Sequence, residues 1–411
     1  MTRRVVVTGI GAVTPIGTGA DGLWAGLQRG TSAVRTITRF DHAMFKSHIA
    51  AEVPDFDVTR WVDERRARRL DRNSAFAIAS AHLAIEDGAL DLATVDKDRT
   101  AVLLGTALGG VAKGEEEHAH FLRGGVREVD PAVALSVFAG AASCNIAMET
   151  GFTGLNVTNG MSCASGAIAI GEAFHAIQRG QADVALAGGS EAPLAQLCYG
   201  AFAIIRAMST RNDDPATASR PFDLDRDGFV MGEGSAMLLL EERERALARG
   251  ARIYVELTGY GTTNDAFHMT APRPDGSQAA RAIRMALDDA GIAPGEVGYI
   301  NAHASSTSLN DSTETLAIRQ VFGAATDQIP VSGTKGYHAH ALGASGAFEA
   351  AICALASHRS WLPPCINVFH QDPACDLPLI LGRGLAVSPE YILSNSFGFG
   401  GINAVLVFRR A

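Results

Sequence analysis

The sequence predicts an α/β protein whose sheets are covered by helices on both faces. Short β-branched segments bounded by glycine recur along the chain, and segments with a helical apolar period lie between them. Such alternation of apolar strands and helices is typical of α/β folds. Hydrophobic residues make up 47% of the 411 residues and charged residues 19%, so the chain can bury a large core.

The expected elements follow from these two periods in chain order. Strands are expected at residues 5–7, 101–104, 184–187, 236–240, 253–257, 299–301, 392–394 and 404–408. Helices are expected at residues 74–86, 278–290, 312–322 and 344–357. A further helix is expected after Cys163, because Ile170, Phe174 and Ile177 recur at helical spacing before Gly180.

Two pairs of similar segments indicate an internal duplication. "RVVVTGIG" at 4–11 resembles "RIYVELTGYG" at 252–261, and each segment is a strand that runs into Thr-Gly-x-Gly. "CASGAIAI" at 163–170 resembles "GASGAFEA" at 343–350, and each of these opens a helix. Because the two pairs occur in the same order, we expect a two-fold repeat with its boundary near residue 250.

Composition excludes several classes of protein. The net charge of −9 argues against non-specific nucleic-acid binding. The six cysteines are widely spaced without a Cys-x-x-Cys pair, which fits neither a disulfide framework nor a zinc site and predicts reduced thiols in the cytoplasm. No secretory signal opens the chain. The uncharged or nearly uncharged segments 131–148 and 150–171 are interspersed with polar residues and glycine, so we expect buried interior segments rather than membrane spans.

Cys163 lies in the uncharged run "NGMSCASGAIAIG", at the expected start of a helix. Unpaired amides and the helix dipole at that position favour an anion, which predicts a lowered thiol pKa and a nucleophilic role. The alternative is a structural cysteine, since free cysteines often pack as small apolar side chains.

Three further stretches place side chains that could take part in catalysis at turns between strands and helices. "NAHASSTSLNDSTE" (301–314) contains His303, with Asp311 and Glu314 in the following helix. "SGTKGYHAHALGASG" (332–346) contains Lys335 and His340, and "SNSFGFGGINA" (394–404) contains Phe397 and Phe399. Each of these residues alone is more often a packing residue. Because such turns converge at one edge of an α/β sheet, we expect them to meet Cys163 in one site.

The whole chain resembles the β-ketoacyl-[acyl-carrier-protein] synthases of type II fatty acid synthesis, close to the synthase II subclass of the thiolase-like superfamily. The resemblance rests on "RRVVVTGIGAVTPIG" near the start, "SRPFDLDRDGFVMGEGSA" (219–236) and "SNSFGFGGINA" near the end. It implies a layered αβαβα architecture of two repeated halves: residues 1–250, with the nucleophile, and residues 251–411, with two catalytic histidines.

The resemblance also implies roles for single residues. Cys163 matches the nucleophile, His303 and His340 the two histidines, and Lys335 the lysine that acts on them electrostatically. Phe399 matches a gating residue whose amide, with that of Cys163, forms an oxyanion hole. The residues expected to support this site or to bind substrate are Glu349 (the partner of Lys335), Asp311, Glu314, Leu108 (in the floor of the acyl pocket), Ser305, Thr307 (both on the pantetheine arm) and Phe397.

The implied reaction is a decarboxylative Claisen condensation. An acyl chain waits on Cys163 while a malonyl thioester loses carbon dioxide, and the resulting carbanion attacks the acyl group. Substrates arrive on the phosphopantetheine of acyl carrier protein, in fatty acid or polyketide synthesis. The resemblance implies no metal, redox or other bound cofactor.

Some positions depart from the family pattern. Ala339 stands where glycine usually precedes the second histidine, His338 is an additional histidine, and Ile402 replaces a threonine. Two alternatives therefore stay open: a repurposed ketosynthase that cyclises or transfers an acyl group without decarboxylation, and a silent subunit like a chain-length factor. The departures also leave open a specialised polyketide pathway.

Two surfaces are expected to bind partners. The stretch "RWVDERRARRLDR" (60–72) is either a solvated helix face or a docking site for the acidic carrier protein, formed by Arg65, Arg66, Arg68 and Arg69. The apolar segment 131–148 fits an interface between copies of the chain. The family implies a homodimer, and a heterodimer with a related ketosynthase subunit is the alternative.

Overall fold

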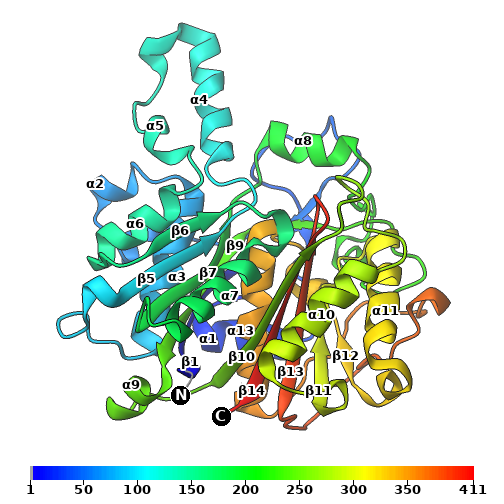
Figure 1. The fold of residues 1–411 in the computed structure, drawn as a ribbon. Helices are drawn as coiled ribbons and strands as arrows, with labels where there is room; N and C mark the ends of the chain where they lie inside the picture. Colours follow the sequence, from blue (N-terminus) through cyan, green and yellow to red (C-terminus); the bar gives the residue numbers. More distant parts are fainter. Residues whose placement is uncertain (1–2) are drawn as a thin grey trace.

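One long mixed sheet runs through the computed structural model, which describes residues 3–411 (Figure 1). Along the sheet the strands are β12 (Val331–Ser332), β11 (Val297–Asn301), β13 (Tyr391–Gly398), β14 (Ile402–Arg410), β10 (Val255–Asn264), β1 (Val5–Thr14), β9 (Gly234–Glu242), β7 (Val184–Glu191), β5 (Thr100–Gly105) and β6 (Asn156–Asn159). The short β2 (Gly17–Thr18) pairs with the end of β1.

The sheet has two wings that meet only where β1 pairs with β10. Three residues of each strand pair there, Val5 to Val7 against Val255 to Leu257. On one side of this contact the order is β1-β9-β7-β5-β6, and on the other it is β10-β14-β13-β11-β12. In both wings the two strands nearest the contact are antiparallel partners, and parallel pairs occur farther out. The two wings therefore share one arrangement.

Helices form three layers around these wings. The central helices α7 (Ser165–Gln178) and α13 (Ser345–Arg359) contact strands of both wings and each other. The outer face of the first wing packs on α3 (Arg72–Asp87), and that of the second on α10 (Ser277–Ala290), which contacts α11 (Ser308–Phe322). This is the expected layered αβαβα architecture.

The central helices approach closely because glycine lies at their crossing. A Cβ atom on Gly166 of α7 would lie 2.9 Å from the backbone nitrogen of Ala347 in α13. A Cβ atom on Gly346 of α13 would lie equally close to the nitrogen of Ala167. The repeated "ASGA" sequence therefore places the N-terminal ends of α7 and α13 against each other, because only hydrogen fits at the two glycines.

The eight expected strands and the expected helices are confirmed, with longer bounds in most cases. The strand expected at 5–7 is β1, which continues to Thr14 through an irregularity between Val7 and Gly9. Its glycine-rich second half is not apolar enough to be recognised from sequence. The short edge strand β6 falls in the partly β-branched segment 154–158 before Cys163, which the sequence indicates as β-type, and it ends one residue later.

The prediction that segment 131–148 lies in the chain's interior is wrong. The segment forms α5 (Val133–Ser136) and the start of α6 (Ala141–Thr150). The side chains of Leu135 and Met148 are 71% and 67% exposed. Together with α4 (Val111–Gly124), α5 projects from the body as an arm (Figure 1). Among residues 3–411, no helix combines the length and apolar character that crossing a membrane requires.

Candidate active site

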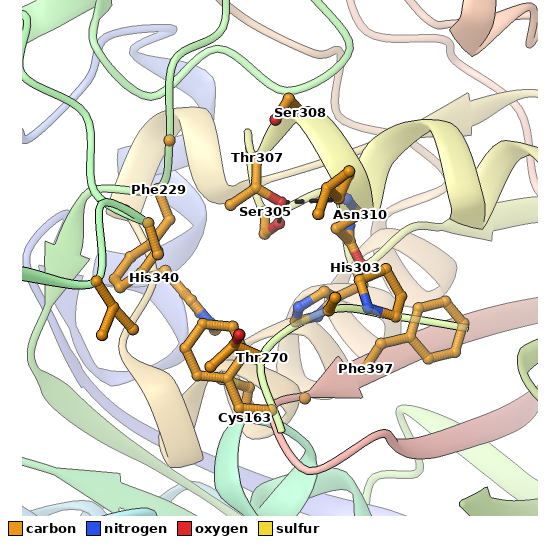
Figure 2. A pocket seen from close by; sticks show the side chains of 18 of the residues that line it. Cys163, Phe229, Thr270, His303, Ser305, Thr307, Ser308, Asn310, His340 and Phe397 are labelled. Atoms are coloured by element: carbon orange, nitrogen blue, oxygen red, sulfur yellow. Dashed lines mark hydrogen bonds between the residues drawn. The ribbon is translucent and has the colours of Figure 1, made fainter. Parts of the chain in front are cut away.

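Cys163, His303 and His340 line a single cavity together with Phe397 and Phe399. Figure 2 shows the two imidazoles and the thiol around the same hollow, as expected from the sequence. The cysteine precedes α7 and His340 precedes α13, so the crossing of the central helices brings both residues to the site. His303 follows β11, and the Phe399 turn follows β13.

Cys163 lies in a 3₁₀ turn, Ser162–Ala164, that leads into α7. The thiol is buried, and burial raises its pKa above the ordinary value. The Ser162 hydroxyl, the backbone N–H of Phe399 and the charge of Lys335 oppose this rise. The prediction of a lowered pKa is therefore wrong, because desolvation outweighs the groups that favour a thiolate.

The Phe399 turn lies directly over the nucleophile. The Phe399 backbone N–H lowers the pKa of Cys163, and a Cβ atom on Gly398 would lie 3.0 Å from the Cys163 nitrogen. Phe399 is half-buried, and its ring stacks on Phe202 with a centroid distance of 6.4 Å. Gly398 thus lets the turn approach the start of α7, and the amide of Phe399 favours the charged form of the thiol.

The His303 loop is held by two buried carboxylates of α11. Glu314 accepts hydrogen bonds from the N–H groups of His303 and Ala304, each at 2.8 Å. Asp311 accepts from the N–H groups of Phe222, at 2.9 Å, and Ser306, at 3.2 Å. Asp311 and Glu314 therefore support the loop, as expected, and do not line the cavity.

A buried ion pair lies behind His303. Nζ of Lys335 donates to Oε1 of Glu349 and to the backbone oxygen of His303, and it lies 3.3 Å from Nδ1 of His303. An ammonium group only donates, so Nδ1 accepts and the imidazole proton is on Nε2. Burial raises the pKa of Glu349 to about 7, and Lys335 opposes that rise. The expected pairing of Lys335 with Glu349 is thus observed.

His340 is fixed by contacts on several sides. Its Nδ1 lies 2.8 Å from Oγ of Ser345, and its ring packs edge-to-face on Phe229 at a centroid distance of 5.4 Å. The centroids of His303 and His340 are also 5.4 Å apart. Burial and the charge of Lys335 hold the pKa of both imidazoles well below the ordinary range, so both are neutral near pH 7.

The expected substrate residues divide into two groups. Ser305 and Thr307 line the cavity, and their hydroxyls lie 2.9 Å apart. Leu108 does not line this cavity. It packs against an apolar cluster that includes Cys163, Tyr199 and Leu342. Its backbone N–H donates to the buried carboxylate of Glu191, at 3.1 Å.

Several lining residues were not singled out from the sequence. The cavity is also lined by Phe202, Arg206, Phe229, Thr270, Leu342 and Asn403. Phe229 lies in the quoted "DGFVMGEG" stretch, which could have identified it. Leu342 and Asn403 likewise lie in the quoted stretches 332–346 and 394–404. Phe202, Arg206 and Thr270 lie on a short helix or on loops without a recognisable period, and only the folded chain brings them to the site.

The arginines expected to dock a carrier protein do not lie on one helix. Segment 60–72 is broken into a 3₁₀ turn, the short helix α2 (Glu64–Ala67) and the start of α3. Arg65, Arg68 and Arg69 line one exposed hollow of the surface, with Asp63, Glu64 and Asp130 beside them. Arg66 points elsewhere and pairs with Glu149. Within residues 3–411, neither Arg65 nor Arg69 forms an ion pair.

Comparison with known proteins agrees with this geometry. Residues 2–246 match the model of the N-terminal domain of β-ketoacyl synthases, and residues 254–369 match that of the C-terminal domain. The chain is 46% identical over 408 residues to 3-oxoacyl-[acyl-carrier-protein] synthase 2 of Synechocystis, covering 99% of this chain and 98% of that protein. It is 42% identical to the Staphylococcus aureus protein of the same name, with the same coverage.

Two solved structures resemble the model over their whole length. The ishigamide ketosynthase/chain length factor superposes with a TM-score of 0.94, and a type II polyketide ketosynthase (AntDE) solved in complex with its acyl-carrier protein (AntF) superposes with a TM-score of 0.93. Each is 36% identical to this chain, with complete coverage of both chains.

Proposed function

Since the chain belongs to the β-ketoacyl synthase family, we propose that Cys163, His303 and His340 divide a decarboxylative condensation between them. The chain is an acyltransferase of the 3-oxoacyl-[acyl-carrier-protein] synthase type, which joins an acyl thioester to malonyl carrier protein in fatty acid or polyketide synthesis. The observation that carries the assignment of roles is one buried thiol and two neutral imidazoles in the same cavity.

In the first step the Cys163 thiolate attacks the carbonyl carbon of the acyl thioester. The new carbon–sulfur bond forms, the bond to the carrier's thiol breaks, and that thiol leaves with the proton lost by Cys163. The N–H groups of residues 163 and 399 stabilise the oxyanion of the tetrahedral intermediate. The backbone N–H of Phe399 favours the charged form of Cys163, which supports this role.

In the second step the malonyl group loses carbon dioxide. The bond to the carboxylate breaks and its electron pair becomes an enolate, whose oxygen accepts hydrogen bonds from Nε2 of His303 and Nε2 of His340. The contact with Lys335 leaves the His303 proton on Nε2, and the Ser345 hydroxyl is placed to do the same for His340 when it donates to Nδ1. Neutral imidazoles that face the cavity suit this role.

In the third step the enolate carbon attacks the acyl carbonyl on Cys163. A carbon–carbon bond forms, the carbon–sulfur bond to the cysteine breaks, and the thiolate takes up a proton from water. The product is a β-ketoacyl thioester on the carrier protein. The substrates are held by their phosphopantetheine arms, for which Ser305 and Thr307 offer hydroxyl groups along the cavity. This chemistry requires no further cofactor.

The carrier protein is proposed to dock at the hollow of Arg65, Arg68 and Arg69. The hollow also holds Asp63, Glu64 and Asp130, and Arg68 pairs with Glu64, so Arg65 and Arg69 are the two guanidinium groups proposed to meet an acidic partner. The AntDE structure, solved with an acyl-carrier protein, supports a carrier as partner. Arg66 belongs to the docking site expected from the sequence, but it is left out of this proposal because it forms an ion pair with Glu149.

The chain is proposed to form a homodimer through segment 131–148 and the neighbouring edge strand. Leu135, Phe138 and Met148 are exposed on one chain, as are Leu155 and Val157 on or next to β6. An exposed edge strand with apolar neighbours favours association. The ishigamide structure pairs a ketosynthase with a chain length factor, so a heterodimer is the alternative.

The remaining expectations are also proposals. The two-fold order of the wings supports a duplication whose halves are residues 1–250 and 251–411. All six cysteines are unpaired, which supports a reducing, cytoplasmic setting. A silent chain-length-factor role is disfavoured because the thiol and both imidazoles share the cavity.

Single-step assays of three variants test the assignment of roles. Cys163→Ala should form no acyl-enzyme, as seen by mass spectrometry of the tryptic peptide, and should still release carbon dioxide from malonyl carrier protein. His303→Ala and His340→Ala should form the acyl-enzyme and lose the decarboxylation. An acylated Cys163→Ala protein, or histidine variants that decarboxylate at the wild-type rate, would refute the roles. Wild-type protein that is acylated but releases no carbon dioxide would favour the non-decarboxylating alternative.

A further inference from the structure

The backbone directly before His340 adopts a conformation that normally requires glycine. Ala339 has φ +58° and ψ −160°, a region where a Cβ atom is strained. Its methyl group is fully buried in a small apolar cluster with Val34, Ile49 and Val230. The strained alanine is therefore held in place by its surroundings.

The peptide group that joins Ala339 to His340 is hydrogen-bonded at both ends. Its N–H, on His340, donates to the carbonyl of Val230 at 2.8 Å. Its carbonyl, on Ala339, accepts from Nδ1 of His338 at 2.8 Å. The carbonyl of His340 in turn accepts from the N–H of Gly232 at 2.9 Å. The backbone that carries the His340 imidazole is thus fixed on either side.

The His338 side chain is itself fixed in one protonation state. A carbonyl oxygen only accepts, so Nδ1 carries the proton. Nε2 then accepts from the hydroxyl of Thr334, at 3.2 Å. The ring is fully buried and packs edge-to-face on Phe348, and burial lowers its pKa to about 3. His338 does not line the cavity, and its hydrogen bond toward the site runs through the carbonyl of Ala339.

We propose that His338 is a positioning residue for His340. Its hydrogen bond keeps the strained Ala339 peptide in place, and that peptide sets the direction of the His340 side chain. Without the bond, Ala339 relaxes toward an ordinary backbone conformation and His340 turns away from the enolate oxygen. The inference rests on the proposed role of His340 in decarboxylation.

This mechanism predicts that the need for His338 depends on the strain at Ala339. Glycine adopts the same φ and ψ without strain, so in an Ala339→Gly background the peptide keeps its place without the hydrogen bond. Loss of His338 should then be tolerated. If His338 only stabilised the fold, the Ala339→Gly change would not restore activity to a variant without His338. That change removes a methyl group from one apolar cluster and replaces none of the buried contacts that His338 makes.

The test measures carbon dioxide release from malonyl carrier protein and acylation of Cys163 in the same preparations. His338→Leu removes the donor and keeps an apolar side chain, and it should lower decarboxylation by about tenfold or more while acylation changes less than twofold. His338→Asn keeps a donor close to the Nδ1 position and should retain most of the rate. The double variant His338→Leu/Ala339→Gly should recover most of the lost rate. Thermal unfolding of each variant shows whether it is folded.

The outcomes separate the inference from the function on which it rests. If His340→Ala decarboxylates normally, the role of His340 is wrong and His338 has nothing to position. If His340→Ala is inactive and folded His338→Leu decarboxylates normally, only the positioning role is wrong. A parallel loss of acylation and decarboxylation in His338→Leu, or a double variant as impaired as the single one, would also overturn the inference.

Discussion

Nζ of Lys335 lies 3.3 Å from Nδ1 of His303, and both groups are buried. The contact does two things for the site. It leaves the His303 proton on Nε2, which faces the cavity, and it places a positive charge beside the imidazole that keeps the ring neutral. Glu349 balances that charge from α13. This geometry supports the proposal that the lysine orients His303 and acts on it electrostatically, and that it is not a base.

Removal of this charge should impair decarboxylation more than acylation. Lys335→Met alone would leave the Glu349 carboxylate buried without a partner, so the test variant is Lys335→Met/Glu349→Gln. Without the lysine, the His303 proton can lie on Nδ1 instead of Nε2. The rate of carbon dioxide release should therefore fall by about ten- to a hundredfold, which is a smaller loss than removal of a whole oxyanion donor causes. Glu349→Gln alone is the control for the lost acid. A double variant that decarboxylates like wild type would contradict the role of Lys335.

Decarboxylation should be insensitive to acid over the range in which ordinary histidines titrate. The pKa values of His303 and His340 are lowered well below the ordinary 6.5, so both rings stay neutral as the pH falls from 8 to 6. The loss of activity should therefore begin only well below 6.5. A pH profile of carbon dioxide release under saturating malonyl carrier protein measures this. Because the pKa of Glu349 is raised to about 7, the profile is also measured for Glu349→Gln. A half-maximal rate near pH 6.5 in both proteins would show that the imidazoles are not held neutral.

Charge reversal in the arginine hollow should weaken carrier binding selectively. Arg65→Glu/Arg69→Glu places two carboxylates where an acidic partner would dock, and it should raise the KM for acyl carrier protein by about tenfold or more. The KM for a small acyl thioester should stay unchanged. Arg281→Glu/Arg284→Glu, on exposed positions of α10, makes the same charge change away from the hollow. If both double variants raised the KM for acyl carrier protein equally, the carrier would not dock at this hollow.

The side chain of Leu108 should limit the length of the acyl chain. It packs beside Cys163 and Leu342 in the apolar cluster behind the nucleophile, a position from which it can close an acyl pocket. Leu108→Phe should shorten the preferred chain without slowing short primers. Each buried methylene contributes about 0.8 kcal/mol, so the preference should shift steeply with length. Chain-length profiles of Cys163 acylation measure it, and identical profiles would mean that the pocket floor lies elsewhere.

The sequence was sufficient to predict which residues meet in the cavity, because each lies at a recognisable turn between a strand and a helix. Cys163, His303 and His340 come from three separate turns and meet in one cavity. Their protonation could not be predicted from sequence. The raised pKa of Cys163 depends on how completely the fold excludes water from the thiol, which no local pattern encodes.

Other features were missed because they depend on contacts between distant segments. The arm of α4 and α5 has apolar residues that sequence alone places in a core, yet Leu135 is exposed on the single chain. Arg66 belongs to the same basic stretch as Arg65, and only the fold shows that it pairs with Glu149. His338 and Ala339 were recognised as unusual, but their hydrogen bond and backbone angles emerge only from the structure.

The central claim is that acyl-Cys163 is attacked by a carbanion formed through loss of the malonyl carboxylate. The most direct measurement supplies wild-type protein with an acyl carrier protein and with malonyl carrier protein labelled with ¹³C in its free carboxylate, and analyses product and gas by mass spectrometry. The account predicts a β-ketoacyl product two carbons longer than the primer and free of label, with one labelled carbon dioxide for each product molecule. A product that retains the label, or a primer transferred without elongation, would contradict it.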